Sequence, residues 1–117
     1  DAFDRLSSAR DARGRKLIVH KIHQPGPLFI NREESTGIEN HGNAVPRDEG
    51  NRLAGYYVNF YMANNGIVMP VFDDPNDDRA ITKIQSIFSE RKIIGIPARE
   101  ILLGGGNIHC ITQQQPA

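Results

Sequence analysis

The spacing of hydrophobic positions changes several times along this 117-residue chain, and each change marks a predicted element. Near the start, apolar side chains recur at every third position, at Phe3, Leu6 and Ala9. This spacing predicts a helix over residues 1–13. Residues 17–22 are apolar on both alternating faces, which predicts a strand that is covered on its two sides.

Residues 24–51 have no sustained hydrophobic period and are rich in proline, glycine and polar side chains. A stretch of this length without regular structure is unusual inside a compact domain. Two interpretations stay open for this long loop: a lid or access loop, or a disordered insert.

Two β-rich runs, 57–63 and 67–72, are joined by a turn that ends in Asn65-Gly66. Asn-Gly between two such runs is a strong signal for a β-hairpin. Pro70 cannot donate a hydrogen bond to a neighbouring strand. We therefore expect the second strand to lie at a sheet edge or to have a free position there.

A helix is predicted directly after this hairpin. Asp73-Asp74-Pro75 offers an N-cap residue followed by a proline in the first helical turn. From there to about Glu90, apolar residues follow one helical face. Its members are Ile81, Ile84, Ile87 and Phe88.

Residues 92–97 form another apolar run, which predicts a second buried strand. Residues 57–97 thus follow the order strand, strand, helix, strand, which is one ββαβ module of an α/β fold. Three glycines at 104–106 then lead into a predicted short strand over 107–113. We treat residues 1–117 as part of a single domain.

Charge and composition exclude several classes of protein. Fourteen Lys and Arg residues balance fourteen Asp and Glu residues, so the basic footprint of a nucleic-acid-binding protein is absent. Apolar stretches such as 66–72 are far shorter than the roughly 18 residues of a membrane-spanning helix. A single cysteine favours a reducing, cytoplasmic compartment. The chain begins with Asp1 rather than Met, and this residue lies within a predicted helix. We therefore expect the chain to be a piece of a longer protein.

Cys110 is the first candidate for chemistry, because it is a lone thiol shortly after a triple glycine. Free cysteines are most often buried small hydrophobes. Consecutive glycines, however, are typical of loops where a backbone or ligand must approach closely. His109 is adjacent, and on a strand it would point to the opposite face, so we expect it to be structural.

Asn59 is a second candidate, since it is a polar amide within a β-rich run. It is either a core asparagine with satisfied hydrogen bonds or a functional group. Metal-binding spacing is absent, so we expect no metal site, and the glycines lack the Lys-Ser/Thr of a phosphate loop. The soft or borderline ligands are His20, His23, His41, His109 and Cys110.

Several runs of this sequence carry a longer resemblance. They are residues 52–54, 57–61, 71–72, 74–77, 97–103 and, above all, Gly104-Gly105-Gly106-Asn107-Ile108-His109-Cys110-Ile111-Thr112 with the tail to Ala117. Together they resemble the C-terminal part of the agmatine deiminase family, which is shared with bacterial-type peptidylarginine deiminases. The resemblance is weakest over 24–51, and it departs at Gly55-Tyr56, usually Ala-Ser, and at Asp73, usually Gly.

The resemblance implies a pentein fold, an α/β propeller of ββαβ modules around a central channel, of which this chain is the C-terminal portion. It implies that Cys110 is a nucleophile forming an amidino-cysteine intermediate and that Asn59 belongs to the active site. It also implies that Gly105, Gly106 and Asn107 bind substrate. The acid–base histidine and the carboxylates of the family are expected upstream of Asp1.

The implied reaction converts agmatine and water to N-carbamoylputrescine and ammonia in putrescine synthesis, without a metal or organic cofactor. The isolated chain is then expected to be inactive, because it lacks most of the machinery. The alternatives are a deiminase of peptidylarginine or another guanidine, and a non-catalytic fragment. The missing N-terminal part is the expected partner, and whether the protein is a homo-oligomer stays open.

Overall fold

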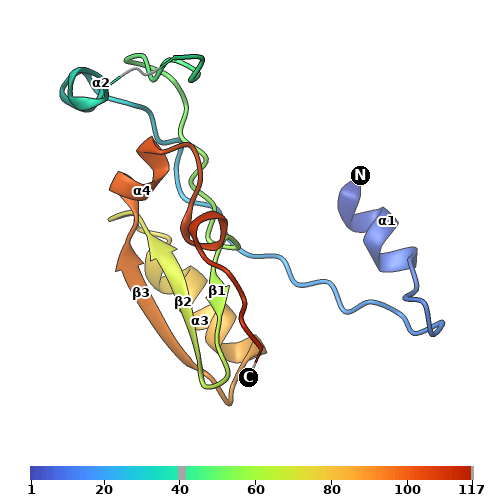
Figure 1. Cartoon of the computed structure of the whole chain (residues 1–117). Helices are drawn as coiled ribbons and strands as arrows, with labels where there is room; N and C mark the ends of the chain where they lie inside the picture. Colours follow the sequence, from blue (N-terminus) through green and yellow to red (C-terminus); the bar gives the residue numbers. More distant parts are fainter. Residues whose placement is uncertain (40–41, 117) are drawn as a thin grey trace.

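The computed structural model describes residues 1–39 and 42–116, so His41 and Ala117 lie outside the described residues. Its elements are arranged along the chain as shown in Figure 1. They are the helices α1 (Ala2–Ser8) and α2 (Arg32–Gly37), the strands β1 (Tyr61–Met62) and β2 (Gly66–Val71), the helix α3 (Asp77–Ile87), the strand β3 (Lys92–Pro97), the helix α4 (Arg99–Leu103) and the 3₁₀ helix η1 (Ile108–Ile111).

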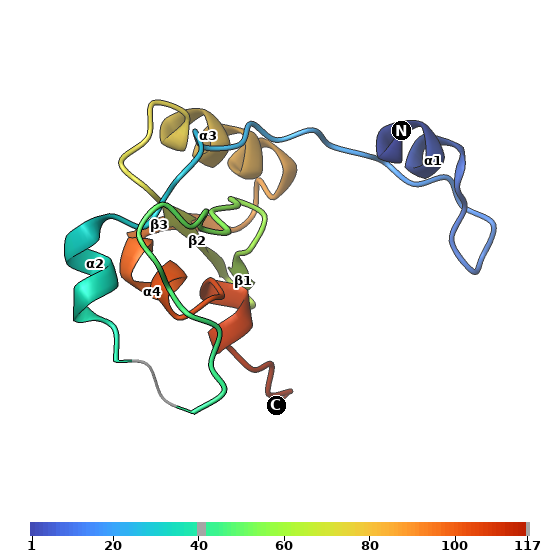
Figure 2. The same ribbon diagram turned by 90° about the horizontal axis from the view of Figure 1, so that it is seen from above.

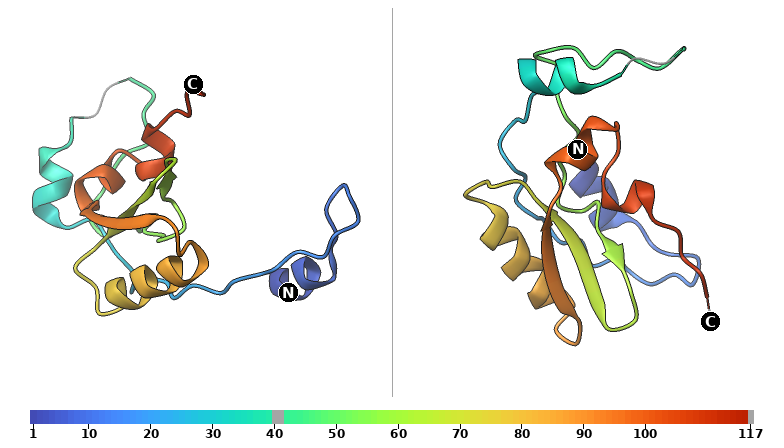
Figure 3. Two further views of the ribbon diagram at one scale, coloured as in Figure 1. Left: turned by 90° about the horizontal axis from the view of Figure 1, so that it is seen from below. Right: turned by 60° about the vertical axis from the view of Figure 1, so that its left-hand side comes forward.

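The three strands form one sheet in the order β1-β2-β3. β1 and β2 are the antiparallel arms of the predicted hairpin, with Tyr61 opposite Val68. β2 and β3 are parallel from Gly66↔Lys92 onward, and α3 connects them. The predicted order of strand, strand, helix, strand is therefore observed. α3 covers one face of the sheet, whereas α4 and η1 lie on the other side (Figures 2 and 3).

The core joins both sides of this sheet. Its members include residues of β2, α3 and α4, together with an aromatic residue that precedes β1. The largest fully buried apolar side chains are Tyr57, Ile67, Met69, Ile84 and Leu102. Burial of each stabilises the fold by roughly 1.5–3 kcal/mol, so this cluster holds α3 and α4 against β2.

The first strand is shorter than predicted, because residues 57 and 58 form a turn. Tyr57 is fully buried, and its hydroxyl donates a hydrogen bond of 2.6 Å to the Asp77 carboxylate. The same carboxylate accepts the backbone N–H groups of Phe72 and Asp74. The predicted N-cap is also wrong, since α3 begins at Asp77 with Asn76 as its N-cap residue. Asp77 thus ties the turn before β1 to the start of α3.

The prediction of a strand over 17–22 is wrong. These residues have no strand in the structure, and Ile18 is 83% exposed. α1 ends at Ser8 rather than near residue 13, and it lies away from the sheet with the segment that follows it (Figure 1). Apolar spacing predicts a strand only if another strand is available to pair with it.

β3 was predicted to be buried, and this is also wrong. It is the edge of the described sheet, and Ile94 is 43% exposed. Pro70, in contrast, lies in the central strand. Among the described residues, β1 pairs only with Ile67 and Val68 of β2, so Pro70 has no strand partner on the β1 side. Of the two predicted alternatives, a sheet edge or a free position, the structure has the free position.

Residues 24–51 are irregular apart from α2, in the part that the structure describes. Asn31 and Glu34 form a capping box at the start of α2. Arg99 binds the Glu34 carboxylate from α4, with 2.5 Å between Nε and Oε1. Backbone hydrogen bonds join Ile30 to Gly50 and Asn51, so the residues on either side of this stretch are held close together. No described helix has the length and apolar character needed to cross a membrane.

Candidate active site

The segment that carries the cysteine begins at the end of α4. Leu102 is 1% exposed and anchors this helix in the core. The backbone N–H of Gly105 donates a hydrogen bond to the Leu102 carbonyl, and Gly105 has a φ of 90°. Glycine adopts this left-handed conformation without the strain that a Cβ atom would cause. The chain can therefore reverse sharply before Asn107.

The predicted strand over 107–113 is wrong, because residues 108–111 form the 3₁₀ helix η1. Asn107 is its N-cap residue, and its Oδ1 accepts the backbone N–H of Ile108 at 2.8 Å. The Asn107 carbonyl accepts the backbone N–H of Cys110 at 2.9 Å. Asn107 is only 1% exposed, and its Nδ2 has no partner within the described residues. Its observed contacts therefore shape the turn on which Cys110 lies.

Asn59 and Cys110, both predicted site residues, lie in contact although 51 positions separate them. Nδ2 of Asn59 donates to the Cys110 sulfur across 3.4 Å. The other end of the same amide, Oδ1, accepts the backbone N–H of His109 at 2.8 Å. One side chain thus holds η1 in place and directs a hydrogen-bond donor at the sulfur.

The Cys110 thiol is exposed, and the structure makes it more acidic than an ordinary cysteine. The hydrogen bond from Asn59 is the main cause that lowers the pKa of Cys110, and a hydrogen bond with the Asn107 backbone acts in the same direction. Donors stabilise the negative thiolate more than the neutral thiol. A lowered pKa raises the fraction of thiolate, which is the nucleophilic form of cysteine, and exposure lets a reagent reach it.

Gly106 brings the turn against this sulfur. A Cβ atom at this position would lie 2.8 Å from Cβ of Cys110 and 3.4 Å from its sulfur. The side of Gly105 that would carry a Cβ atom is occupied by the guanidinium of Arg47. No sequence pattern indicates Arg47, because its contact with Gly105 joins two irregular segments.

The expectation that His109 points away from Cys110 assumed a strand, and that basis is wrong. Within residues 1–39 and 42–116, no hydrogen bond links the His109 imidazole to the sulfur, whereas its backbone N–H is held by Asn59. The same residues contain no group of three His, Cys, Asp or Glu side chains placed to hold a metal ion.

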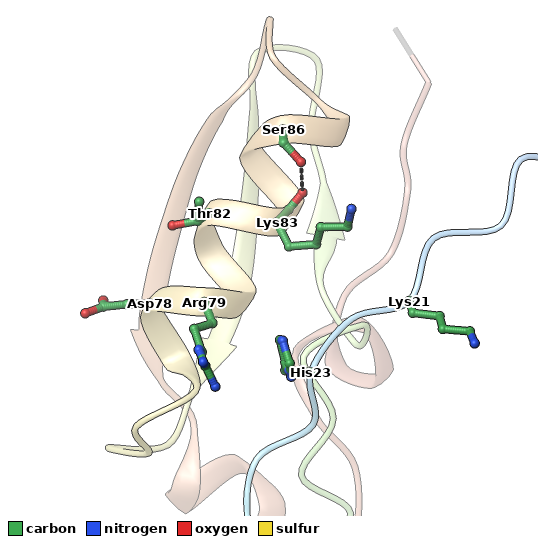
Figure 4. A pocket seen from close by; sticks show the side chains of 7 residues that line it. All are labelled: Lys21, His23, Asp78, Arg79, Thr82, Lys83 and Ser86. Carbon is green, nitrogen blue, oxygen red and sulfur yellow. Dashed lines mark hydrogen bonds between the residues drawn. The ribbon is translucent and has the colours of Figure 1, made fainter.

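A groove of about 590 Å³ lies elsewhere, between α3 and the extended segment that follows α1. Figure 4 shows its lining side chains, among them Lys21, His23 and Arg79. It shares no lining residue with the Cys110 site, and α3 lies on the opposite side of the sheet from η1 (Figure 2). The groove and the surroundings of Cys110 are therefore separate features of the described residues.

Comparisons with known proteins agree with this geometry. The agmatine deiminase of Pseudomonas aeruginosa is 56% identical over 112 residues, covering 96% of this chain and 30% of that protein. The solved agmatine deiminase of Enterococcus faecalis has a TM-score of 0.90 and 39% identity, covering 99% of this chain and 32% of its own. That of Campylobacter jejuni has a TM-score of 0.56 and 29% identity, covering 74% and 21%.

The chain thus spans about a third of the length of the curated relatives that it matches. The likeness to deiminase structures confirms the predicted pentein-type α/β fold. The family model for the Porphyromonas-type peptidyl-arginine deiminase matches residues 1–116, nearly the whole chain. On this match the chain belongs to the Porphyromonas-type peptidyl-arginine deiminase family.

Proposed function

We propose that this chain is the nucleophile-bearing part of an enzyme that hydrolyses agmatine to N-carbamoylputrescine and ammonia. The observation that carries this proposal is the 3.4 Å contact between Asn59 Nδ2 and the exposed sulfur of Cys110. Relatives named agmatine deiminase, 56% identical in sequence and 39% identical in a solved structure, support the choice of substrate.

The guanidinium of agmatine is a delocalised cation that stays protonated at neutral pH, so its central carbon resists attack by a weak nucleophile. A thiolate is strong enough, and a bound cation next to Cys110 favours the thiolate further. The sulfur forms a bond to the central carbon, and ammonia leaves after a general acid gives it a proton. Water then attacks the amidino-cysteine, the S–C bond breaks, and the carbamoyl product and the thiol are released.

This mechanism needs groups that the described residues do not place at Cys110. Carboxylates must hold the planar N–H fork of the substrate, and an acid–base group must serve both half-reactions. We assign these groups to the remainder of a longer protein, since relatives extend over about three times the length of this chain. The isolated chain is then inactive. We place the reaction in cytoplasmic putrescine synthesis, without a cofactor, and the oligomeric state is open.

Ammonia release from agmatine by the full-length protein tests the proposal. Cys110→Ser should abolish turnover and leave the melting temperature within a few degrees, because the two side chains are nearly isosteric. A variant slowed in the second half-reaction and mixed with agmatine should carry the substrate less ammonia, an amidino group that keeps the aminobutyl chain, on the peptide that contains Cys110. Turnover by Cys110→Ser, or ammonia release by the isolated chain above a blank without enzyme, would contradict the proposal.

A second candidate substrate is peptidylarginine, because the family model is named for a peptidyl-arginine deiminase. Both substrates carry a guanidinium group, and they differ at the opposite end of the aliphatic carbons that bear it. Initial rates with agmatine and with arginyl peptides at equal concentration separate the two. A non-catalytic fragment is the remaining alternative, and the intact mass of the natural product tests it.

A further inference from the structure

Arg47 lies in the irregular segment between α2 and β1, and its guanidinium contacts the turn before Cys110. A Cβ atom built on Gly105 would overlap Nη2 of Arg47, and it would lie 3.0 Å from Cζ and 3.6 Å from Nη1. Three atoms of the planar head group therefore lie within 4 Å of the position of this Cβ atom. The guanidinium occupies the space where any other residue at position 105 would have its side chain.

Cys110 contacts the same turn through the neighbouring glycine. The space above Gly106 is closed by Cβ and the sulfur of Cys110, at 2.8 Å and 3.4 Å from an added Cβ atom. The turn thus has Arg47 packed on Gly105 and Cys110 packed on Gly106. Any displacement of the two glycines changes the position of the sulfur.

A run of three glycines, 104–106, has more accessible backbone conformations than any other tripeptide. A nucleophile, however, must be held within roughly 0.5 Å of its productive position. A turn of this kind therefore needs a rigid neighbour that restricts it. Within the described residues, Arg47 is the charged side chain that closes the Gly105 side.

Arg47 is half-buried, and its side chain has no hydrogen bond or ion pair in the part of the chain that the structure describes. Its contact with Gly105 is therefore one of packing by the planar head group. The plane of the guanidinium is a property that neither methionine nor lysine has.

We infer that Arg47 is a positioning residue for the Cys110 nucleophile: its guanidinium packs on Gly105 and fixes the turn against which Cys110 lies. Its effect on turnover rests on the proposed function, whereas its effect on the reactivity of the sulfur does not. Loss of the head group frees the turn, and the contact between Asn59 and the sulfur then loosens.

The test uses Arg47→Met and Arg47→Lys in the full-length protein. Methionine keeps much of the length and the apolar stem of arginine, and lysine keeps the positive charge but lacks the planar guanidinium. Arg32→Met is the matched control, because Arg32 is exposed on α2, within residues 24–51 like Arg47, and has no described side-chain partner. We measure kcat and KM for agmatine, and the alkylation rate of Cys110 by iodoacetamide against pH. Trypsin releases the peptide that begins at Glu100, in which Cys110 is quantified.

In Arg47→Met, kcat should fall tenfold or more while KM stays within threefold, and the alkylation profile should move to higher pH. Arg47→Lys should show a smaller loss, and Arg32→Met should match the wild type. The inference is overturned if Arg47→Met matches Arg32→Met in the alkylation profile. It is also overturned if the wild type turns over agmatine and Arg47→Met has the same kcat.

Two further outcomes are decided in the same experiment. If Arg47→Met loses cooperative melting, Arg47→Lys decides, and wild-type kcat together with a wild-type alkylation profile in that variant overturns the inference. If the wild type releases no ammonia from agmatine, the proposed function fails. The alkylation profiles then still support or overturn the role of Arg47 by themselves.

Discussion

Gly106→Ala directly perturbs the surroundings of the Cys110 sulfur, because it adds one methyl group beside this residue. The new Cβ atom would lie 2.8 Å from Cβ of Cys110, whereas carbon atoms in contact are normally about 3.5–4.0 Å apart. The φ of Gly106 lies outside the left-handed region, so alanine causes no backbone strain there. The effect of the substitution therefore comes from this contact.

The magnitude follows from the geometry of η1. Cβ of Cys110 cannot rotate away, because it is attached to a backbone held by the Asn107 carbonyl. The turn and η1 must separate by about 0.7 Å or more, and overpacking of this size costs roughly 1–3 kcal/mol. The same shift lengthens the 3.4 Å contact between Asn59 and the sulfur beyond hydrogen-bond reach. The pKa of Cys110 then rises, because this contact is the main cause that lowers it.

The assay is the iodoacetamide rate of Cys110 against pH, together with the free energy of unfolding in urea. We expect slower alkylation near neutral pH and a normal rate in alkali, where the thiolate forms in either protein. Gly37→Ala is the control, since no atom lies within 4 Å of its added Cβ atom and its φ is not positive. A wild-type alkylation profile with unchanged stability in Gly106→Ala would refute the close contact between the glycine turn and Cys110.

Two predictions concern the scaffold around this site. Tyr57→Phe should lower the free energy of unfolding by about 1–2 kcal/mol in urea denaturation, because it removes the 2.6 Å hydrogen bond to Asp77; unchanged stability would contradict this. The hydrogen bond from Arg99 holds the pKa of Glu34 below its usual 4.5, so this stabilisation is present above that pH and is lost as the pH falls. The melting temperature of Glu34→Gln should therefore decline less than that of the wild type between about pH 6 and pH 3, and equal declines would contradict the pairing.

The hairpin and α3 could be predicted because their signals are local. The turn at Asn65-Gly66 needs only its own residues, and the apolar face that includes Ile84 is visible from spacing alone. Residues 17–22 and Lys92–Pro97 were predicted to be buried because apolar residues imply a covering partner. Their exposure follows from the absence of that partner among the described residues.

The site itself was only partly predictable. Ile108 and Ile111 have the i, i+3 spacing of a 3₁₀ turn, and Asn107 is a good N-cap residue, so η1 had a signal that the strand prediction missed. The pairing of Asn59 with Cys110 was reached only through resemblance, because it joins residues 51 positions apart. The place of Arg47 beside the turn could not be predicted, because it rests on a long-range contact with a glycine and no residue pattern indicates such a contact.

Asn59 offers a sharper test than removal of its side chain. Alanine would remove both the donor to the Cys110 sulfur and the acceptor for the backbone N–H of His109. Asn59→Asp keeps an oxygen for the His109 N–H and replaces the Nδ2 donor with a second carboxylate oxygen. A structural role and a chemical role therefore predict different outcomes for this single variant.

If Asn59 acts on the sulfur, Asn59→Asp should keep its stability within about 1 kcal/mol of the wild type but raise the pKa of Cys110, because lost donation and added negative charge both disfavour the thiolate. Complete alkylation at high pH counts the intact sites, so turnover can be expressed per reactive cysteine. A loss of a hundredfold or more, about 2.7 kcal/mol of barrier, would assign Asn59 to the reacting group. A rate within about threefold, or under roughly 0.7 kcal/mol, would make Asn59 scaffold, since its bond to His109 survives in the variant.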